Sequence, residues 1–130
     1  MAIDINEYKK LYITTARDLL KIMNRALSAM KTDRCDQKAI NDFLIAAHSL
    51  KSQSLVMGYT QTGLASKILE QIFRDLKDQL TCATPEVLPL IEKAVIKLHQ
   101  SIGNIENQQG EIDLAEETEH LSKLTSIPVV

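Results

Sequence analysis

The 130-residue chain has no tryptophan, and aromatic side chains make up only 4% of it. A surface that binds nucleic acid by stacking bases needs several such rings, so this class of site is not expected. The formal net charge is -2 and the basic residues are scattered, which leaves no cationic surface for a phosphate backbone. Nucleic acid is therefore not an expected partner.

Long apolar runs are also missing. No stretch approaches the roughly 20 residues that cross a bilayer, and the opening segment MAIDINEYKK has no apolar signal-peptide core. With 45% hydrophobic and 25% charged residues, the chain has the composition of a folded globular domain. We therefore expect a soluble, cytoplasmic protein that does not associate with a membrane.

Cysteine is scarce, and Cys35 and Cys82 are the only two in the chain. They lie too far apart in the sequence to show the close spacing of a metal site. Thiols of cytoplasmic proteins stay reduced. We expect both residues to be inert thiols, bonded neither to a metal ion nor to each other.

Apolar residues recur at steps of three and four along most of the chain, which is the spacing of one face of an α-helix. Four such stripes occupy residues 12–30, 40–54, 64–80 and 87–105. Neither an internal repeat nor the alternating pattern of a strand is present. The length suffices for one compact domain and not for two well-formed cores.

Polar residues, glycine and proline separate the stripes. Asp36 is a suitable N-cap for the second helix, and Gly58 supplies the left-handed conformation that often ends a helix. The segment YTQTG is turn-like, so the third helix is expected to begin only after it. The motif TPE at 84–86 opens the fourth helix, while Pro89 bends or delays its first turns.

Short connections between long helices imply antiparallel neighbours, so the predicted fold is all-α, an antiparallel up-down four-helix bundle. A coiled-coil dimer competes with it, but the helices are too short and too clearly separated by turns to favour a dimer. Polar outer faces suggest a monomer. In this topology the first and third connections lie at one end, which places the two cysteines near each other without a bond.

The helical pattern weakens after the segment NQQG. We expect a bundle domain over residues 1–108, followed at residues 109–130 by a weakly helical tail or an interdomain linker. Within this second part, residues 111–124 form either a short fifth helix or a polar connection.

One histidine lies in the second helix, within the segment AAHSLKSQSLVMGY. On a helical wheel of about 100° per residue, His48 falls on the flank of the apolar stripe. From there one ring nitrogen reaches solvent while the other faces a neighbouring helix. Lys51 lies one turn along on the same surface. Helix geometry alone nevertheless favours an ordinary solvated histidine over a functional one.

The same segment resembles the phosphorylation-site helix of histidine-containing phosphotransfer (HPt) domains, and is most similar to those of CheA-like chemotaxis kinases. The family pattern is a histidine, a small hydroxyl residue, an apolar residue, a lysine and, seven residues later, a glycine. In this chain these are His48, Ser49, Leu50, Lys51 and Gly58. The run LASKILEQIFRDL resembles the third helix of the family, whose glutamate maps onto Glu70. The resemblance covers residues 3–106.

The resemblance implies that His48 accepts a phosphoryl group from an ATP-binding histidine kinase domain and passes it to an aspartate of a response-regulator receiver domain. It also implies that Glu70 orients His48, while Lys51 and Lys67 supply charge near the phosphoryl oxygens. The alternative for Glu70 is a surface carboxylate that pairs with Lys67 or Arg74. Two positions depart from the family pattern, because Ser52 replaces a frequent glycine and Lys67 a frequent histidine.

No glycine-rich phosphate loop and no acidic cluster for Mg²⁺ is present in the sequence. We expect the kinase partner domain to use ATP and Mg²⁺, and this domain to bind no cofactor and no metal ion. The resemblance therefore implies a phosphocarrier rather than a stand-alone kinase. His99 and His120 lack the surrounding pattern and are not expected to accept phosphate.

Two other functions stay open. The first is a helical adaptor that binds a partner through the side of the second helix between Ile45 and Leu55, without phosphorylation. The second is an independent HPt protein of a multistep phosphorelay. The polar segment after Gly110 resembles the start of an interdomain linker and favours a piece of a CheA-like kinase over the independent protein.

Overall fold

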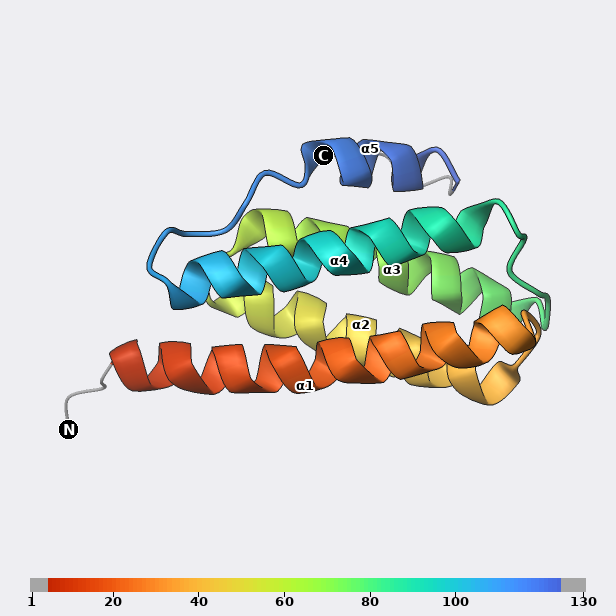
Figure 1. The fold of residues 1–130 in the computed structure, drawn as a ribbon, viewed down its shortest axis with the longest axis horizontal. Coiled ribbons are helices and arrows are strands. Elements are labelled where there is room, and N and C mark those ends of the chain that lie inside the picture. Colours follow the sequence, from red (N-terminus) through yellow and green to blue (C-terminus); the bar gives the residue numbers. More distant parts are fainter. Residues whose placement is uncertain (1–4, 125–130) are drawn as a thin grey trace.

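The structure, a computed structural model, describes residues 5–124, which form five α-helices and no strand (Figure 1). The helices are α1 (Ile5–Thr32), α2 (Gln37–Val56), α3 (Thr60–Asp78), α4 (Val87–Glu106) and the short α5 (Ala115–Ser122). None of these five helices combines the length and the apolar character needed to cross a membrane.

The four long helices run up and down around a common core. α2 packs between α1 and α3, and α4 packs against α1 (Figure 1). Arg17 Nη1 donates to Glu106 Oε2 over 2.8 Å, whereas Lys31 Nζ donates to Glu92 Oε1 over 3.0 Å. Because the α4 partner moves back in the sequence as the α1 residue moves forward, these two helices are antiparallel. The predicted all-α, up-down four-helix bundle is confirmed.

The core is built from the apolar stripes of all four long helices. Met23, Phe43, Phe73 and Leu98 are fully buried examples, one from each helix. The two phenylalanine rings stack between α2 and α3 with their centroids 3.8 Å apart. Burying one side chain of this kind stabilises the fold by about 1.5–3 kcal/mol. This packing fixes how α2 and α3 lie relative to each other.

Several helix ends follow their sequence signals. The Asp36 carboxylate accepts a hydrogen bond of 3.0 Å from the backbone N–H three residues on, so it caps α2 as predicted. Gly58 has the left-handed φ of +83°. Thr84 Oγ1 accepts a bond of 3.2 Å from the N–H of Val87, but α4 begins only at Val87, after the TPE motif, so this helix starts later than predicted. Pro89 lies in the first turn of α4, where a missing N–H leaves no intrahelical bond unmade.

The start of α3 differs from the prediction. The segment YTQTG is not a turn throughout, because residues 60–63 form the first turn of α3. Glu111 Oε1, in the connection after α4, accepts bonds of 2.8 Å from Thr62 N and 3.0 Å from Thr62 Oγ1. A side-chain acceptor here pairs one of the N–H groups that a helix start leaves unsatisfied. The helix therefore begins earlier than its local sequence suggests.

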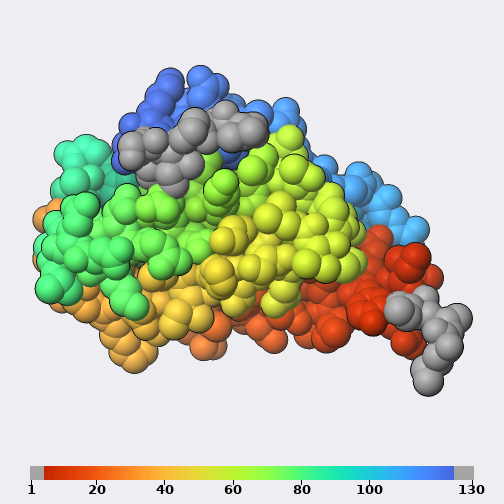
Figure 2. All heavy atoms as spheres, turned by 180° about the vertical axis from the view of Figure 1, so that it is seen from behind, coloured from red at the N-terminus to blue at the C-terminus, as the bar shows by residue number. Residues whose placement is uncertain are grey.

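The segment after α4 returns along the bundle. α5 packs against α3 and α4, and Leu114 and Leu121 are buried there. In the opposite view, α5 (blue) lies beside α3 (Figure 2). The short fifth helix, one of the two predicted alternatives, is confirmed. The predicted division of the chain at residue 108 stays a prediction, and residues 125–130 of the predicted tail lie outside the described part.

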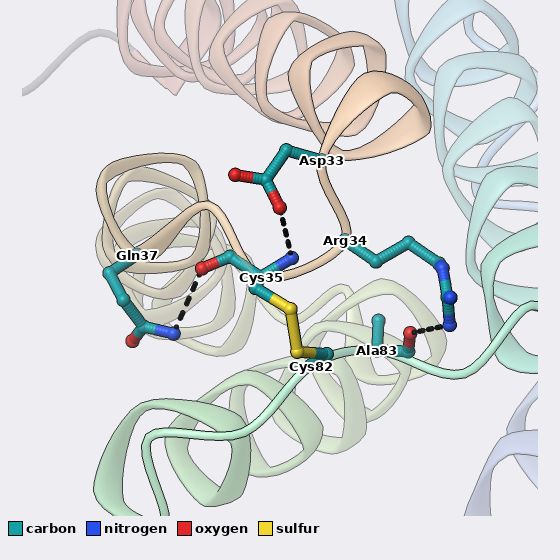
Figure 3. The surroundings of a disulfide bond; sticks show 6 residues. All are labelled: Asp33, Arg34, Cys35, Gln37, Cys82 and Ala83. Atoms are coloured by element: carbon teal, nitrogen blue, oxygen red, sulfur yellow. Dashed lines mark hydrogen bonds between the residues drawn. A yellow bond between two sulfur atoms is a disulfide. The ribbon is translucent and has the colours of Figure 1, made fainter.

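Two connections at one end of the bundle are joined covalently (Figure 3). Cys35, between α1 and α2, forms a disulfide with Cys82, between α3 and α4, and their Cα atoms are 4.2 Å apart. Beside it, Ala83 N donates to Arg34 O and Arg34 Nη1 donates to Ala83 O, both over 3.1 Å. The cysteines lie at the same end as predicted, but the prediction of unbonded thiols is wrong. That prediction rests on the expected compartment, whereas the topology brings the two connections into contact.

Candidate functional site

His48 lies on α2 beside α3, and 56% of its side chain is exposed. Its two ring nitrogens have different surroundings. Nδ1 is 2.8 Å from Glu70 Oε1 on α3. Nε2 has no hydrogen bond to any residue between positions 5 and 124. A molecule that approaches from solvent therefore meets Nε2.

Glu70 is the centre of this polar cluster. Its side chain is only 7% exposed, and Lys51 Nζ is 2.8 Å from its Oε2. Its Oε1 accepts from His48 Nδ1 at 2.8 Å and from Arg74 Nη2 at 3.1 Å. A longer contact of 3.3 Å joins Lys51 Nζ to the same Oε1. Such partners compensate for the hydration that a buried carboxylate loses.

Opposing effects set the protonation of Glu70. Burial raises the pKa of its carboxyl, whereas hydrogen bonds from Lys51, His48 and Arg74 lower it, and the pKa ends below its ordinary value. Glu70 is therefore ionised at neutral pH. Because an ionised carboxylate only accepts hydrogen bonds, the proton of the neutral His48 ring lies on Nδ1. The ring then carries its lone pair on Nε2.

The two lysines of the predicted site lie in different surroundings. Lys51, one turn after His48, is 23% exposed and directs its ammonium group at Glu70. Lys67, one turn before Glu70, is exposed and makes no hydrogen bond or ion pair within the described residues. The structure thus brings His48, Glu70 and Lys51 together and leaves Lys67 apart. The roles of all four in phosphotransfer stay predictions.

Arg74 belongs to the cluster, although the sequence pattern does not single it out as a site residue. Its position four residues after Glu70 indicates an ion pair on the surface of α3. From the sequence, that pair is an alternative to the contact with His48. The structure contains both, because the carboxylate has enough acceptor positions for the two donors.

The helices present these side chains from a packed base. Ala47 and Leu50 on α2 and Leu69 on α3 are fully buried beside the site. Ser52 Oγ donates to the carbonyl oxygen of His48 over 3.1 Å. Its hydroxyl is therefore directed at the helix backbone and not at the imidazole, which leaves the ring open on this side.

The other two histidines differ from His48. His99 Nε2 on α4 is 3.0 Å from Asn24 Nδ2, and burial together with the charge of Arg17 lowers the pKa of its ring. His120 on α5 is exposed. Over residues 5–124, His48 alone has a ring nitrogen bonded to a carboxylate. The same part of the chain holds no group of three His, Cys, Asp or Glu side chains that could bind a metal ion.

The arrangement suits nucleophilic group transfer. An exposed nitrogen carries a lone pair, and a carboxylate behind the ring selects the tautomer and stabilises positive charge on it. Two permanent cations, Lys51 and Arg74, contact that carboxylate. The site therefore supplies a nucleophile together with the groups that orient it and adjust its charge.

The sequence is similar to those of known proteins. The family described as Hpt domain matches residues 7–123. The chain is also similar to the chemotaxis protein CheA of Bacillus subtilis (strain 168), with 26% identity over 114 residues. That alignment covers 87% of this chain and 17% of the relative, so the chain spans only a minor part of the relative's length.

Proposed function

This chain belongs to the Hpt domain family, the histidine phosphotransfer domains of two-component signalling, and we propose that His48 is its phosphoacceptor. The 2.8 Å hydrogen bond between His48 Nδ1 and the buried Glu70 carboxylate carries this proposal. It leaves a lone pair on Nε2 at the exposed side of the ring. His48 accepts a phosphoryl group from an ATP-binding histidine kinase domain and passes it to an aspartate of a response-regulator receiver domain.

In the uptake step, the lone pair of Nε2 attacks the γ-phosphorus of ATP. The N–P bond forms, and the P–O bond to ADP breaks with its electron pair on ADP. The proton stays on Nδ1, so the ring becomes positively charged, and Glu70 stabilises this charge at hydrogen-bond distance. ATP and Mg²⁺ belong to the kinase domain, while this domain supplies the nucleophile and its orientation.

In the release step, a carboxylate oxygen of the receiver aspartate attacks the phosphorus and the N–P bond breaks. The electron pair returns to Nε2, and the ring is neutral again with its proton on Nδ1. In the proposal, Lys51 and Lys67 supply positive charge near the phosphoryl oxygens. Such charge-assisted contacts contribute about 1.5–3 kcal/mol when well placed, and less in solvent.

An apolar groove beside the site supports docking of the receiver. It has a volume of about 370 Å³ and lies between α1 and α2, where Tyr8, Leu11 and Val56 line it. Leu11 and Val56 are 63% and 86% exposed. Ser52 lines the same groove and lies one turn from His48. A receiver that brings its aspartate to His48 covers this apolar surface.

A CheA-like chemotaxis kinase is the proposed context. The similarity to CheA extends over 87% of this chain but only 17% of that relative, so catalysis by a kinase belongs to regions that this chain does not match. We propose that the chain is the phosphotransfer domain of such a kinase. Because the kinase takes its ATP inside the cell, this role places the domain in the cytoplasm, where the Cys35–Cys82 disulfide meets a reducing environment. Outside the apolar groove, its polar outer faces fit a monomer.

The test compares His48→Gln with the matched variant His99→Gln. Each purified chain is incubated with the ATP-binding core of a CheA-like kinase and ATP labelled at the γ-phosphate. We expect acid-labile label on the parent chain and on His99→Gln, and none on His48→Gln. Circular dichroism should show the same helix content in all three. A receiver domain added afterwards should remove the label.

Label on His48→Gln at the parental level would overturn the assignment of His48. No label on the parent chain, combined with receiver binding that is unchanged in His48→Gln, would instead support the helical adaptor. Label that leaves the parent chain only by hydrolysis, and never reaches the receiver, would contradict the proposed carrier role.

A further inference from the structure

We propose that Arg74 sets the balance between uptake and release of the phosphoryl group, by weakening the hold of Glu70 on the His48 ring. The inference rests on the proposed function, although its first measurement needs neither a kinase nor a receiver. Arg74 acts through Glu70, so it is a positioning residue and not a catalytic one.

His48 and Arg74 share one oxygen atom of Glu70. Oε1 lies 2.8 Å from His48 Nδ1 and 3.1 Å from Arg74 Nη2, while Oε2 lies 2.8 Å from Lys51 Nζ. A carboxylate oxygen has two lone-pair directions, and His48 and Arg74 are the two nearest donors to Oε1, while Lys51 Nζ lies further from it at 3.3 Å. The positive charge of Arg74 partly neutralises Oε1, so the carboxylate attracts the imidazole less strongly.

Arg74 is not needed to hold Glu70 in place. The Glu70 side chain is only 7% exposed, and Lys51 Nζ contacts both of its oxygens, at 2.8 Å and 3.3 Å. The orientation of the carboxylate therefore survives the loss of Arg74. The Arg74 side chain is itself 46% exposed, so its replacement opens no hole in the core. What Arg74 contributes to the site is its positive charge.

The effect of the Arg74 charge depends on whether the His48 ring is neutral or positively charged. The His48 ring is neutral before uptake and positively charged while it carries the phosphoryl group, because the proton stays on Nδ1. Glu70 favours the charged ring, and a guanidinium on the same oxygen opposes it. With Arg74 present, Nε2 is a weaker nucleophile in uptake and a better leaving group when the N–P bond breaks. Without Arg74, uptake becomes faster and the phosphoryl group remains longer.

The first experiment observes the hydrogen bond directly. Arg74→Gln removes the charge, and the matched control Lys77→Gln removes the same charge from an exposed position one turn further along α3. The readout is the NMR resonance of the His48 Nδ1 proton, which moves downfield as its bond to the carboxylate strengthens. We expect a downfield shift in Arg74→Gln and none in Lys77→Gln. An unchanged or upfield resonance in Arg74→Gln overturns the proposal.

The second experiment measures both directions without a protein partner. Phosphoramidate donates the phosphoryl group: its P–N bond breaks, ammonia leaves with the electron pair and a proton from water, and the bond to Nε2 forms. Hydrolysis of the purified phosphorylated chain then measures release. We expect Arg74→Gln to be phosphorylated about two- to fivefold faster and hydrolysed slower by a similar factor, the range for a partly exposed ion pair.

Equal rates in parent and Arg74→Gln, slower uptake in Arg74→Gln, or an identical effect of Lys77→Gln would each overturn the proposal. The failure of this proposal can be distinguished from the failure of the proposed function. If the kinase core never labels His48 but the Nδ1 proton still shifts in Arg74→Gln, the coupling through Glu70 stands and the phosphotransfer role does not.

Discussion

Ion pairs join two antiparallel helix pairs of this bundle, and the carboxylates of these ion pairs differ in their exposure to solvent. Between α1 and α4, Arg17 pairs with Glu106 and Lys31 with Glu92, and every one of these side chains is at least 43% exposed. Between α2 and α3, the carboxylate that receives the cations is Glu70, and it is only 7% exposed. The carboxylates thus meet water in the α1–α4 pair and protein in the α2–α3 pair.

Exposure decides what these ions do. A surface ion pair contributes about 0–1 kcal/mol to stability, because water and salt screen both charges. A buried carboxylate loses its hydration and depends on its partners, but its charge acts on a neighbouring group with little screening. The α1–α4 ions fasten two helices together. In the proposed function, the α2–α3 ions prepare an imidazole for reaction.

Opening the disulfide is expected to have the largest effect, and it acts on the α2–α3 side of the comparison. Cys35 and Cys82, 47 residues apart, close a loop that contains α2 and α3 but neither α1 nor α4. For a loop of this length, chain entropy predicts a loss of about 4 kcal/mol in the free energy of unfolding. Urea unfolding of the oxidised chain, the reduced chain and the Cys35→Ser/Cys82→Ser variant measures the loss. Equal values for all three would contradict it.

Glu70→Gln comes next and tests the buried carboxylate itself. In the proposed function, the variant removes the charge that stabilises the phosphorylated ring, and because an amide can both accept and donate, it no longer selects one tautomer. We expect the rate of phosphoryl uptake from the kinase core to fall roughly 10- to 100-fold, the loss seen when a carboxylate that orients a metal-binding histidine is removed. Glu106→Gln, the same change on the exposed α1–α4 edge, serves as the control and should retain the parental rate. Equal losses of uptake rate in both variants would show that the buried and the exposed carboxylate act alike.

Acid should remove the contribution of Glu70 to stability. The fold lowers the pKa of this carboxyl, so the contribution is complete above the unfolded value of about 4.3 and is lost as the pH falls through the folded pKa. The difference in unfolding free energy between parent and Glu70→Gln should therefore shrink on acidification from neutral pH. Urea titrations across this range measure it, and a difference that grows in acid would reverse the expected sign.

Breaking the exposed pair is expected to have the smallest effect. Arg17→Gln should lower the free energy of unfolding by less than about 1 kcal/mol, because both partners remain in water. Phosphoryl uptake should not change. A double-mutant cycle with Glu106→Gln isolates the pair. A coupling energy well above this limit would contradict the expectation that an exposed ion pair contributes little to stability.

Local patterns predicted the features whose causes lie close in the sequence. The spacing of apolar residues predicted the four long helices, and single residues such as Asp36 and Gly58 marked two of their ends. The step of about 100° per residue placed His48 on the flank of α2. Its contact with Glu70 came from the family resemblance, because helix geometry contains no information on a partner 22 residues away.

Long-range contacts account for what the sequence did not predict. The early start of α3 depends on Glu111, 49 residues from the N–H group that it caps. The disulfide depends on two connections that meet only in the folded chain. For Arg74, the spacing predicted a pair with Glu70, but only coordinates show that one oxygen accepts from both Arg74 and His48.

Because Cys35 and Cys82 are joined, a protease that cuts the turn at residues 57–59 breaks the backbone without separating the products. One product carries His48 and the other carries Glu70. On a denaturing gel they migrate as a single band until dithiothreitol is added, and then as two. A nicked molecule is thus distinguished from an intact one only after the sulfur bridge has been opened.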